Sequence, residues 1–183
     1  MGHIVLIGPI GAGKSTVAPL VADLLGRQAI ELDGLRPAVY TELGYDSAAA
    51  DCALEQGGID GLTRYWKPFE LQLVEHAVAL RPDAVLDFGA GHSHYDDPDH
   101  LRRVSAALAP HYVVLLLPSD DLAESGRILA ARAPTEYRDA IVELNAAFLD
   151  SASNAALADH VLITGDRTPT AVAADVATAV TTR

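Results

Sequence analysis

Five short apolar runs recur along the chain, and longer stretches with helical spacing of apolar residues separate them. Because the runs are continuous in Val, Leu and Ile, they predict strands buried on both faces of a parallel sheet. The expected strands cover residues 3–7, 28–32, 84–88, 112–117 and 160–163. The expected helices cover residues 14–25, 62–80, 97–109, 120–132, 136–151 and 169–181. This alternation predicts one doubly wound α/β domain over residues 1–183, with ligands at the carboxyl ends of the strands.

A glycine-rich motif directly follows the first expected strand and precedes the first expected helix. The stretch G-P-I-G-A-G-K-S-T over residues 8–16 fits G-x-x-x-x-G-K-[ST], the phosphate-binding P-loop. In such a loop the backbone N–H groups and the positive end of the helix hold phosphate, Lys14 reaches the β- and γ-phosphates, and Ser15 ligates Mg²⁺. The sequence therefore predicts nucleoside triphosphate binding. The expected nucleotide-binding residues are Gly8, Gly11, Ala12, Gly13, Lys14, Ser15 and Thr16.

A second signal ends the third expected strand. The stretch V-L-D-F-G-A-G over residues 85–91 places Asp87 after an apolar run, the Walker B form in which a carboxylate holds Mg²⁺ directly or through water. We predict Ser15 and Asp87 as the metal-binding residues; the alternative is that Asp87 only forms a turn. The glycine-rich turn that follows allows a ligand to approach closely. The residues of this turn expected to contact the phosphoryl acceptor are Gly89, Ala90, Gly91 and His92.

The segment 34–80, between the second and third expected strands, is longer than a simple connection requires. It contains Tyr40, Tyr45, Tyr65 and Trp66. We interpret it as a helical insertion that binds the acceptor, because a P-loop enzyme must pass its phosphoryl group to a second substrate. The alternative is that these aromatic rings only pack a small helical subdomain.

Asp33 ends the second expected strand, at the edge of the sheet where ligands bind. Its carboxylate is expected to orient or deprotonate the attacking hydroxyl group. Glu31, two residues earlier, would lie on the same face of a strand. The alternative is that Asp33 caps a helix from Gly34 onward.

Arginines on the helix after the fourth expected strand are candidates for stabilising the transition state. Phosphoryl transfer spreads negative charge over equatorial oxygens, and a guanidinium that closes over them stabilises that charge. We expect Arg132 to act in this way, from a short lid at residues 133–135, with Arg127 nearby. The alternative is that these arginines are solvated, which is our interpretation of Arg138. We also interpret Asp97 as a helix N-cap rather than a metal ligand.

The formal net charge of −12 argues against nucleic acid and anionic membranes as partners. A single cysteine, Cys52, excludes an internal disulfide and a cysteine-based metal cluster. No apolar run has the length of a membrane span, and the pattern of a signal peptide is absent around residues 4–10. We therefore expect a cytoplasmic protein that is a monomer or homodimer.

With these motifs in hand, the chain resembles the shikimate kinase family of P-loop kinases along its whole length. The resemblance rests on the P-loop, the aspartate after the second strand, the G-A-G turn after the third, and R-T-P at residues 167–169. It implies a three-layer fold with a five-stranded parallel sheet of order 2-3-1-4-5, and helices on both faces. It implies ATP and Mg²⁺ as cofactors and a small-molecule hydroxyl as acceptor. By the same resemblance Arg127 stacks on adenine, and Arg167 and Pro169 line the adenine pocket.

The sequence departs from the family pattern where the acceptor binds. The F-R pair, whose arginine grips the substrate carboxylate, aligns with Trp66-Lys67, and a second carboxylate-binding arginine aligns with Asn145. Because lysine replaces a bidentate arginine poorly, we expect an acceptor other than shikimate, bound by Asp33, Trp66 and Lys67. The prediction is an ATP-dependent small-molecule kinase with Lys14, Asp33 and Arg132 as catalytic residues. The alternatives are a nucleotide kinase and an ATP-binding switch or sensor without a small-molecule acceptor.

Overall fold

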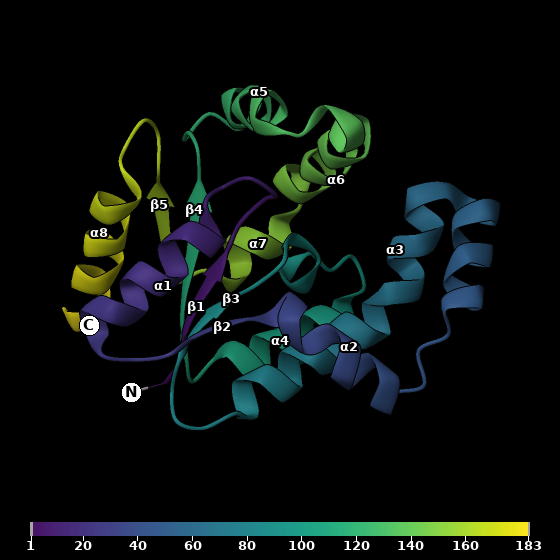
Figure 1. Cartoon of the computed structure of the whole chain (residues 1–183), viewed down its shortest axis with the longest axis horizontal. Coiled ribbons are helices and arrows are strands. Elements are labelled where there is room, and N and C mark those ends of the chain that lie inside the picture. Colours follow the sequence, from purple (N-terminus) through teal and green to yellow (C-terminus); the bar gives the residue numbers. More distant parts are fainter. Residues whose placement is uncertain (1, 183) are drawn as a thin grey trace.

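Five parallel strands form the centre of the structure, a computed structural model that describes residues 2–182 (Figure 1). The strands are β1 (Ile4–Ile7), β2 (Ala29–Glu31), β3 (Val85–Asp87), β4 (Tyr112–Leu117) and β5 (His160–Ile163). Their order across the sheet is β2-β3-β1-β4-β5, which confirms the order implied by the resemblance. In the register of β2 with β3, Glu31 lies opposite Asp87. The carboxyl ends of these two strands therefore lie side by side.

Helices cover both faces of the sheet, as expected for a three-layer α/β fold (Figure 1). They are α1 (Lys14–Leu25), α2 (Leu32–Glu42), α3 (Ser47–Ala79), α4 (Pro98–Leu108), α5 (Leu122–Arg132), α6 (Arg138–Asp150), α7 (Ala152–Leu157) and α8 (Pro169–Thr181). Two short 3₁₀ turns lie at Ala90–Ser93 and Thr135–Tyr137. Helices α1 and α8 bury one face, and α2, α3, α4 and α7 contribute to the core on the other. None of these helices is long and apolar enough to cross a membrane.

Alternate residues of the central strands belong to opposite cores. Ile4 and Leu6 of β1 pack toward α1 and α8, whereas Val5 and Ile7 pack on the other side, and all four are fully buried. The prediction of strands buried on both faces is thus confirmed for β1 and for most of β4. It is wrong for β2, whose ends are exposed, and for β5, where Leu162 is buried but Val161 is exposed, because these two strands lie at the edges of the sheet.

The second expected strand ends one residue earlier than predicted, and this changes the setting of Asp33. Helix α2 begins at Leu32, whose side chain is fully buried, and Glu31 holds the N-cap position in an extended conformation. Asp33 therefore lies in the first turn of a helix, not at the end of a strand. The prediction that Glu31 and Asp33 share one face of a strand is wrong, and so is the alternative that Asp33 is the cap.

The segment 34–80 is helical almost throughout, whereas the sequence analysis, which expected a helical insertion, gave bounds only for a helix over residues 62–80. Helix α3 bends back on itself at Gly58, where φ is 60° and ψ is −154°, and its two arms form a hairpin that projects from the sheet (Figure 1). We call this unit, Ser47–Ala79, the α3 hairpin. In this hairpin the ring of Phe69 contacts the rings of Tyr40 and Tyr45, and its centroid lies 5.3 Å from the centroid of each. Aromatic packing thus joins the α3 hairpin to α2.

Candidate active site

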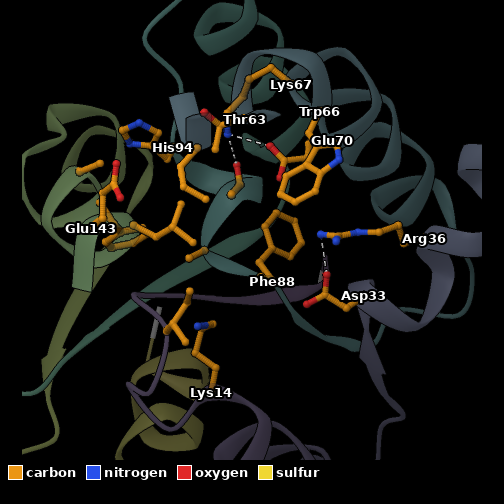
Figure 2. Close-up of a pocket in the computed structure, with 18 of the residues that line it drawn as sticks. Lys14, Asp33, Arg36, Thr63, Trp66, Lys67, Glu70, Phe88, His94 and Glu143 are labelled. Atoms are coloured by element: carbon orange, nitrogen blue, oxygen red, sulfur yellow. Dashed lines mark hydrogen bonds and ion pairs between the residues drawn. The ribbon is translucent and has the colours of Figure 1, made fainter. Parts of the chain in front are cut away.

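The P-loop, the carboxyl ends of β2 and β3, and helices α2, α3 and α6 surround a cavity of about 500 Å³. Figure 2 shows Lys14 at one end of this cavity and Lys67, Thr63 and Trp66 at the other, with Phe88 between them. A volume of this size suits a small molecule. The cavity lies where ligands bind in open α/β sheets, at the carboxyl ends of the strands.

Lys14 lies at the base of the cavity and is held by the loop that precedes it. Its Nζ donates hydrogen bonds to the carbonyl oxygens of Gly8 at 2.8 Å and Pro9 at 3.0 Å. Burial lowers the pKa of Lys14 to about 8, against the opposing charges of Asp87 and Asp33. At neutral pH the ammonium group is therefore mostly protonated. Gly13, at the N-cap of α1, has a φ of 95°, a conformation that favours glycine and turns the loop tightly into the helix.

Asp87 faces Ser15 across the start of α1. Burial raises the pKa of the Asp87 carboxyl to about 6, and the charge of Glu31 adds to this effect. The charge of Lys14 and a hydrogen bond from Ser15 act in the opposite direction. A hydroxyl and a carboxylate in contact are oxygen ligands of the kind Mg²⁺ prefers. These two residues therefore fit the metal position that the sequence predicted.

One wall of the cavity contains an ion pair that the sequence analysis did not identify as part of the site. Asp33 Oδ1 forms an ion pair with Nη2 of Arg36, one turn later on α2, at 2.8 Å. The guanidinium of Arg36 lies 5.5 Å from the ring centroid of Tyr40 and 5.8 Å from that of Trp66. Asp33, Arg36 and Trp66 all line the cavity. The spacing of Asp33 and Arg36 would have signalled this pair once a helix was recognised there.

Lys67 and the glycine-rich turn after β3 are connected at the far end of the cavity. The Nζ of Lys67 donates to Oε2 of Glu70 at 2.7 Å and to the carbonyl oxygen of Gly91 at 2.8 Å. The side chain of Glu70 is only 4% exposed. A Cβ at position 91 would lie 2.1 Å from Oε1 of Glu70, so the turn needs glycine here. Lys67 lines the cavity, and at the same time fixes the turn.

His92 supports the same turn from beneath. It is fully buried and does not line the cavity. Its Nδ1 accepts a hydrogen bond from the backbone N–H of Gly89 at 2.9 Å, and burial lowers its pKa to about 3. The imidazole is therefore neutral with its proton on Nε2. The structure places Gly89, Ala90 and Gly91 on the cavity wall and His92 behind them.

Asn145 of α6 makes a pair of hydrogen bonds with the P-loop. Its Oδ1 accepts from the backbone N–H of Ile10 at 2.8 Å, and its Nδ2 donates to the carbonyl oxygen of Ile10 at 3.0 Å. Asn145 is buried, and its amide has both functions occupied. No local signal in the sequence predicts this contact, because the two residues are far apart along the chain. Glu143 and Leu144, its neighbours on α6, line the cavity.

The predicted arginines lie outside the cavity lining. Nη1 of Arg132 donates to the carbonyl oxygen of Gly11 at 3.2 Å, so this arginine already contacts the P-loop. Arg127 pairs with Glu124 on its own helix, and Arg167 pairs with Asp175 of α8. Pro169 and Thr16 also lie outside the lining. The structure thus brings these predicted residues together in the cavity lining: Lys14, Ser15, Asp33, Trp66, Lys67 and Asp87. The predicted arginines, Pro169 and Thr16 do not line the cavity.

Comparisons with known proteins identify the fold. No protein-family model matches the chain, and no curated protein matches it in sequence. Among solved structures, shikimate kinase from Acinetobacter baumannii in complex with shikimate has a TM-score of 0.65 at 19% identity, over 100% of this chain and 94% of that one. A gluconokinase from Sinorhizobium meliloti 1021 has a TM-score of 0.61 at 14% identity, over 99% and 92%.

A third similar structure is the APS kinase of Mycobacterium tuberculosis in complex with AMPPNP and APS. It has a TM-score of 0.56 at 19% identity, over 98% of each chain. All three proteins are kinases of small molecules by name. At these identities the likeness shows that the chain has their fold.

Proposed function

We propose that the protein transfers the γ-phosphoryl group of ATP to a hydroxyl group of a small molecule. The observation that carries this proposal is the continuous cavity, which joins the P-loop and Asp87 at one end to Asp33, Trp66 and Lys67 at the other. A P-loop next to a recess that suits a small molecule is the arrangement that phosphoryl transfer between two bound molecules requires. The fold shared with small-molecule kinases supports the same assignment.

Each residue at the base of the cavity has a role in holding the nucleotide. The Nζ of Lys14 exchanges the carbonyl oxygens of Gly8 and Pro9 for phosphate oxygens, and the amides of the P-loop bind the β-phosphate. Ser15 and Asp87 would hold Mg²⁺, which would neutralise the developing charge on the phosphates. Arg132, beside Gly11, is close enough to the loop to bind the transferred group from outside. We assign the adenine contacts to Arg127, Arg167 and Pro169.

Asp33 is placed to orient the acceptor hydroxyl. Its Oδ1 is occupied by Arg36, which leaves Oδ2 to accept a hydrogen bond from the acceptor. This geometry fixes the carboxylate on the cavity wall opposite Lys14. The segment 34–80, with Trp66 and Lys67, forms the acceptor side, and Gly89 to Gly91 form its floor.

The experiment that tests the proposal measures ADP release from Mg·ATP with a panel of sugars, cyclitols, hydroxy acids and nucleotides. We expect one class of hydroxyl compound to raise the rate in a saturable way. Lys14→Ala should lose at least about 100-fold in turnover, and Asp33→Asn should lose about 100-fold while its affinity for ATP stays unchanged. Asp51→Asn, an exposed aspartate of α3, is the matched control.

Two outcomes would contradict the proposal in different ways. Full activity of Asp33→Asn would remove Asp33 from the mechanism but leave the kinase assignment intact. Slow ADP release that no acceptor raises, in a protein that still binds ATP, would support a nucleotide-binding switch instead.

A further inference from the structure

At the acceptor end of the cavity, the cationic side chains are already paired with carboxylates of the protein, unlike those of a site that binds anions. We define this end by labelled residues that lie away from Lys14 in Figure 2: Arg36, Thr63, Trp66, Lys67, Glu70, His94 and Glu143. An anionic acceptor would need a cation there that is free to bind it. In the part of the chain that the structure describes, the lysine and arginine side chains at this end are Arg36 and Lys67. Both are engaged with carboxylates of the protein.

Lys67 cannot be released for a ligand without a large cost. Its partner Glu70 has a side chain only 4% exposed, and Lys67 also supports the carbonyl oxygen of Gly91. Moving the ammonium to a ligand would leave a buried carboxylate without its counter-ion, which is strongly destabilising in proteins. The charge of Lys67 is therefore compensated before any acceptor enters.

Arg36 is paired as well, although its side chain and that of Asp33 are more exposed, at 35% and 46%. Its guanidinium lies 2.8 Å from the Asp33 carboxylate, and 5.5 and 5.8 Å from the ring centroids of Tyr40 and Trp66. Asp33 is the carboxylate that the proposed mechanism directs at the acceptor hydroxyl, so the pair acts as a neutral unit. The remaining donors of Arg36 suit hydroxyl oxygens, which need no net charge.

The wall opposite α2 adds negative rather than positive charge. Helix α6 presents Glu143 to the cavity, while Asn145 of the same helix is turned to Ile10 of the P-loop. His94 lies 3.6 Å from Asp96, and burial together with the charge of Lys67 lowers its pKa, so the imidazole is neutral at pH 7. This side of the cavity therefore offers no cation to a ligand.

Carboxylates outnumber cations over the whole lining. Within residues 2–182 the acidic side chains that line the cavity are Glu31, Asp33, Asp60, Glu70, Asp87, Asp96 and Glu143. The lysines and arginines are Lys14, Arg36 and Lys67, and Lys14 belongs to the phosphate end. A concave surface of one sign focuses its field on whatever enters. Bound nucleotide phosphates would add further negative charge to the same space.

From the paired cations and the excess of carboxylates we infer that the acceptor carries no anionic group: it is an uncharged or amine-bearing hydroxyl compound. This inference rests on the proposed function and narrows its substrate class. The carboxylates that line the cavity attract an ammonium group of the acceptor. The side chains of Trp66, Leu144 and Phe148 pack on the apolar part of the acceptor. Thr63 and Arg36 bind its hydroxyl groups. A carboxylate or phosphate on the acceptor would be repelled.

A direct test uses Trp66, the single tryptophan of the chain, as a fluorescent reporter of binding. The probes are three pyranose sugars that share a ring and differ in charge: glucosamine, glucose and glucuronate. We expect the apparent dissociation constant for glucuronate to be at least about tenfold higher than that for glucosamine at low salt, with glucose between them. The difference should shrink as the ionic strength rises. Tightest binding of glucuronate would overturn the inference, as would equal binding or no binding of the three sugars.

Variants separate the sources of the charge preference. Glu143→Gln should reduce the difference between glucosamine and glucuronate by about two- to fourfold, whereas Glu136→Gln, at an exposed position outside the cavity, should leave it unchanged. If Arg36 instead formed an anion site, glucuronate would bind most tightly and Arg36→Gln would abolish that binding. Binding is measured without transfer, so the two proposals fail separately. If the sugars bind in the expected order of charge but no acceptor raises ADP release, the proposed kinase function is contradicted and the inferred charge preference of the cavity stands.

Discussion

Asp87 meets two opposing demands at the scale of a single residue. In the proposed function it must be ionised to hold Mg²⁺, yet it is 6% exposed and burial raises its pKa from an ordinary 3.8 to about 6. The folded protein therefore binds a proton at Asp87 more tightly than the unfolded chain does. Between pH 4 and pH 6 this difference lowers the free energy of unfolding as the pH rises.

We predict that Asp87→Asn stabilises the free protein while it removes Mg²⁺-dependent nucleotide binding. The amide resembles the protonated carboxyl group, so the variant avoids the cost of a buried charge. Relative to the wild type, its free energy of unfolding should gain up to about 3 kcal/mol between pH 4 and pH 6, and the gain should persist at pH 7. Urea denaturation at these pH values measures it. A difference between variant and wild type that does not change with pH would contradict the assignment.

At the scale of the element, the α3 hairpin depends on a close approach of its two arms. A Cβ at Gly61 would lie 2.3 Å from the carbonyl oxygen of Ala53 on the opposite arm, a distance that forces the arms apart. A Cβ at Gly57 would meet only the flexible end of Arg64, at 3.6 Å. Two glycines four residues apart thus differ in what they allow. The hairpin carries Thr63, Trp66 and Lys67, so its geometry shapes the acceptor end of the cavity.

We predict that Gly61→Ala destabilises the α3 hairpin by about 1–3 kcal/mol and that Gly57→Ala is neutral or stabilising, because alanine favours helix. Hydrogen exchange should report faster opening of Ser47–Ala79 in the first variant, with little change in the central strands. Equal exchange in the two variants would show that the arms can separate without cost.

At the scale of the whole molecule, α6 and the P-loop are joined through Asn145, although the partners are 135 positions apart in the sequence. The paired hydrogen bonds to Ile10 fix the loop from the side of the cavity where α6 also contributes Glu143. Helix α6, which lines the cavity, and the P-loop are therefore directly connected. A change in the position of α6 should therefore alter the affinity of the P-loop for the phosphates of ATP.

We predict that Asn145→Ala weakens ATP binding by about tenfold, since the Ile10 amide and carbonyl lose their partners and the loop is released. Asn154→Ala is a suitable control, because Asn154 is also buried and donates to a backbone carbonyl, that of Phe148, but does not contact the P-loop. Both variants should lose about 1–3 kcal/mol of stability. Calorimetric titration with ATP should separate them, and an equal loss of affinity in both would refute the specific coupling.

Local patterns were enough to predict part of the fold and one end of the site. The P-loop is contiguous, so its spacing alone places Lys14 and Ser15 at the start of α1. The strands β1, β3 and β4 were found because burial on both faces leaves a continuous apolar run. Asp87 was found because a polar residue ends such a run.

Tertiary structure decided the rest, because the determining contacts join distant segments or depend on burial. Helix α2 begins early, at Leu32, whose side chain is fully buried, and no local period reveals this burial. The pairing of Lys67 with Glu70 against Gly91 required two segments to meet. Identifying Lys67 from the sequence indicated a residue of the acceptor site, but only the three-dimensional contacts show that its charge is already compensated. The sequence by itself determined a P-loop in an α/β fold, and the tertiary structure decided which charges of the cavity are already paired.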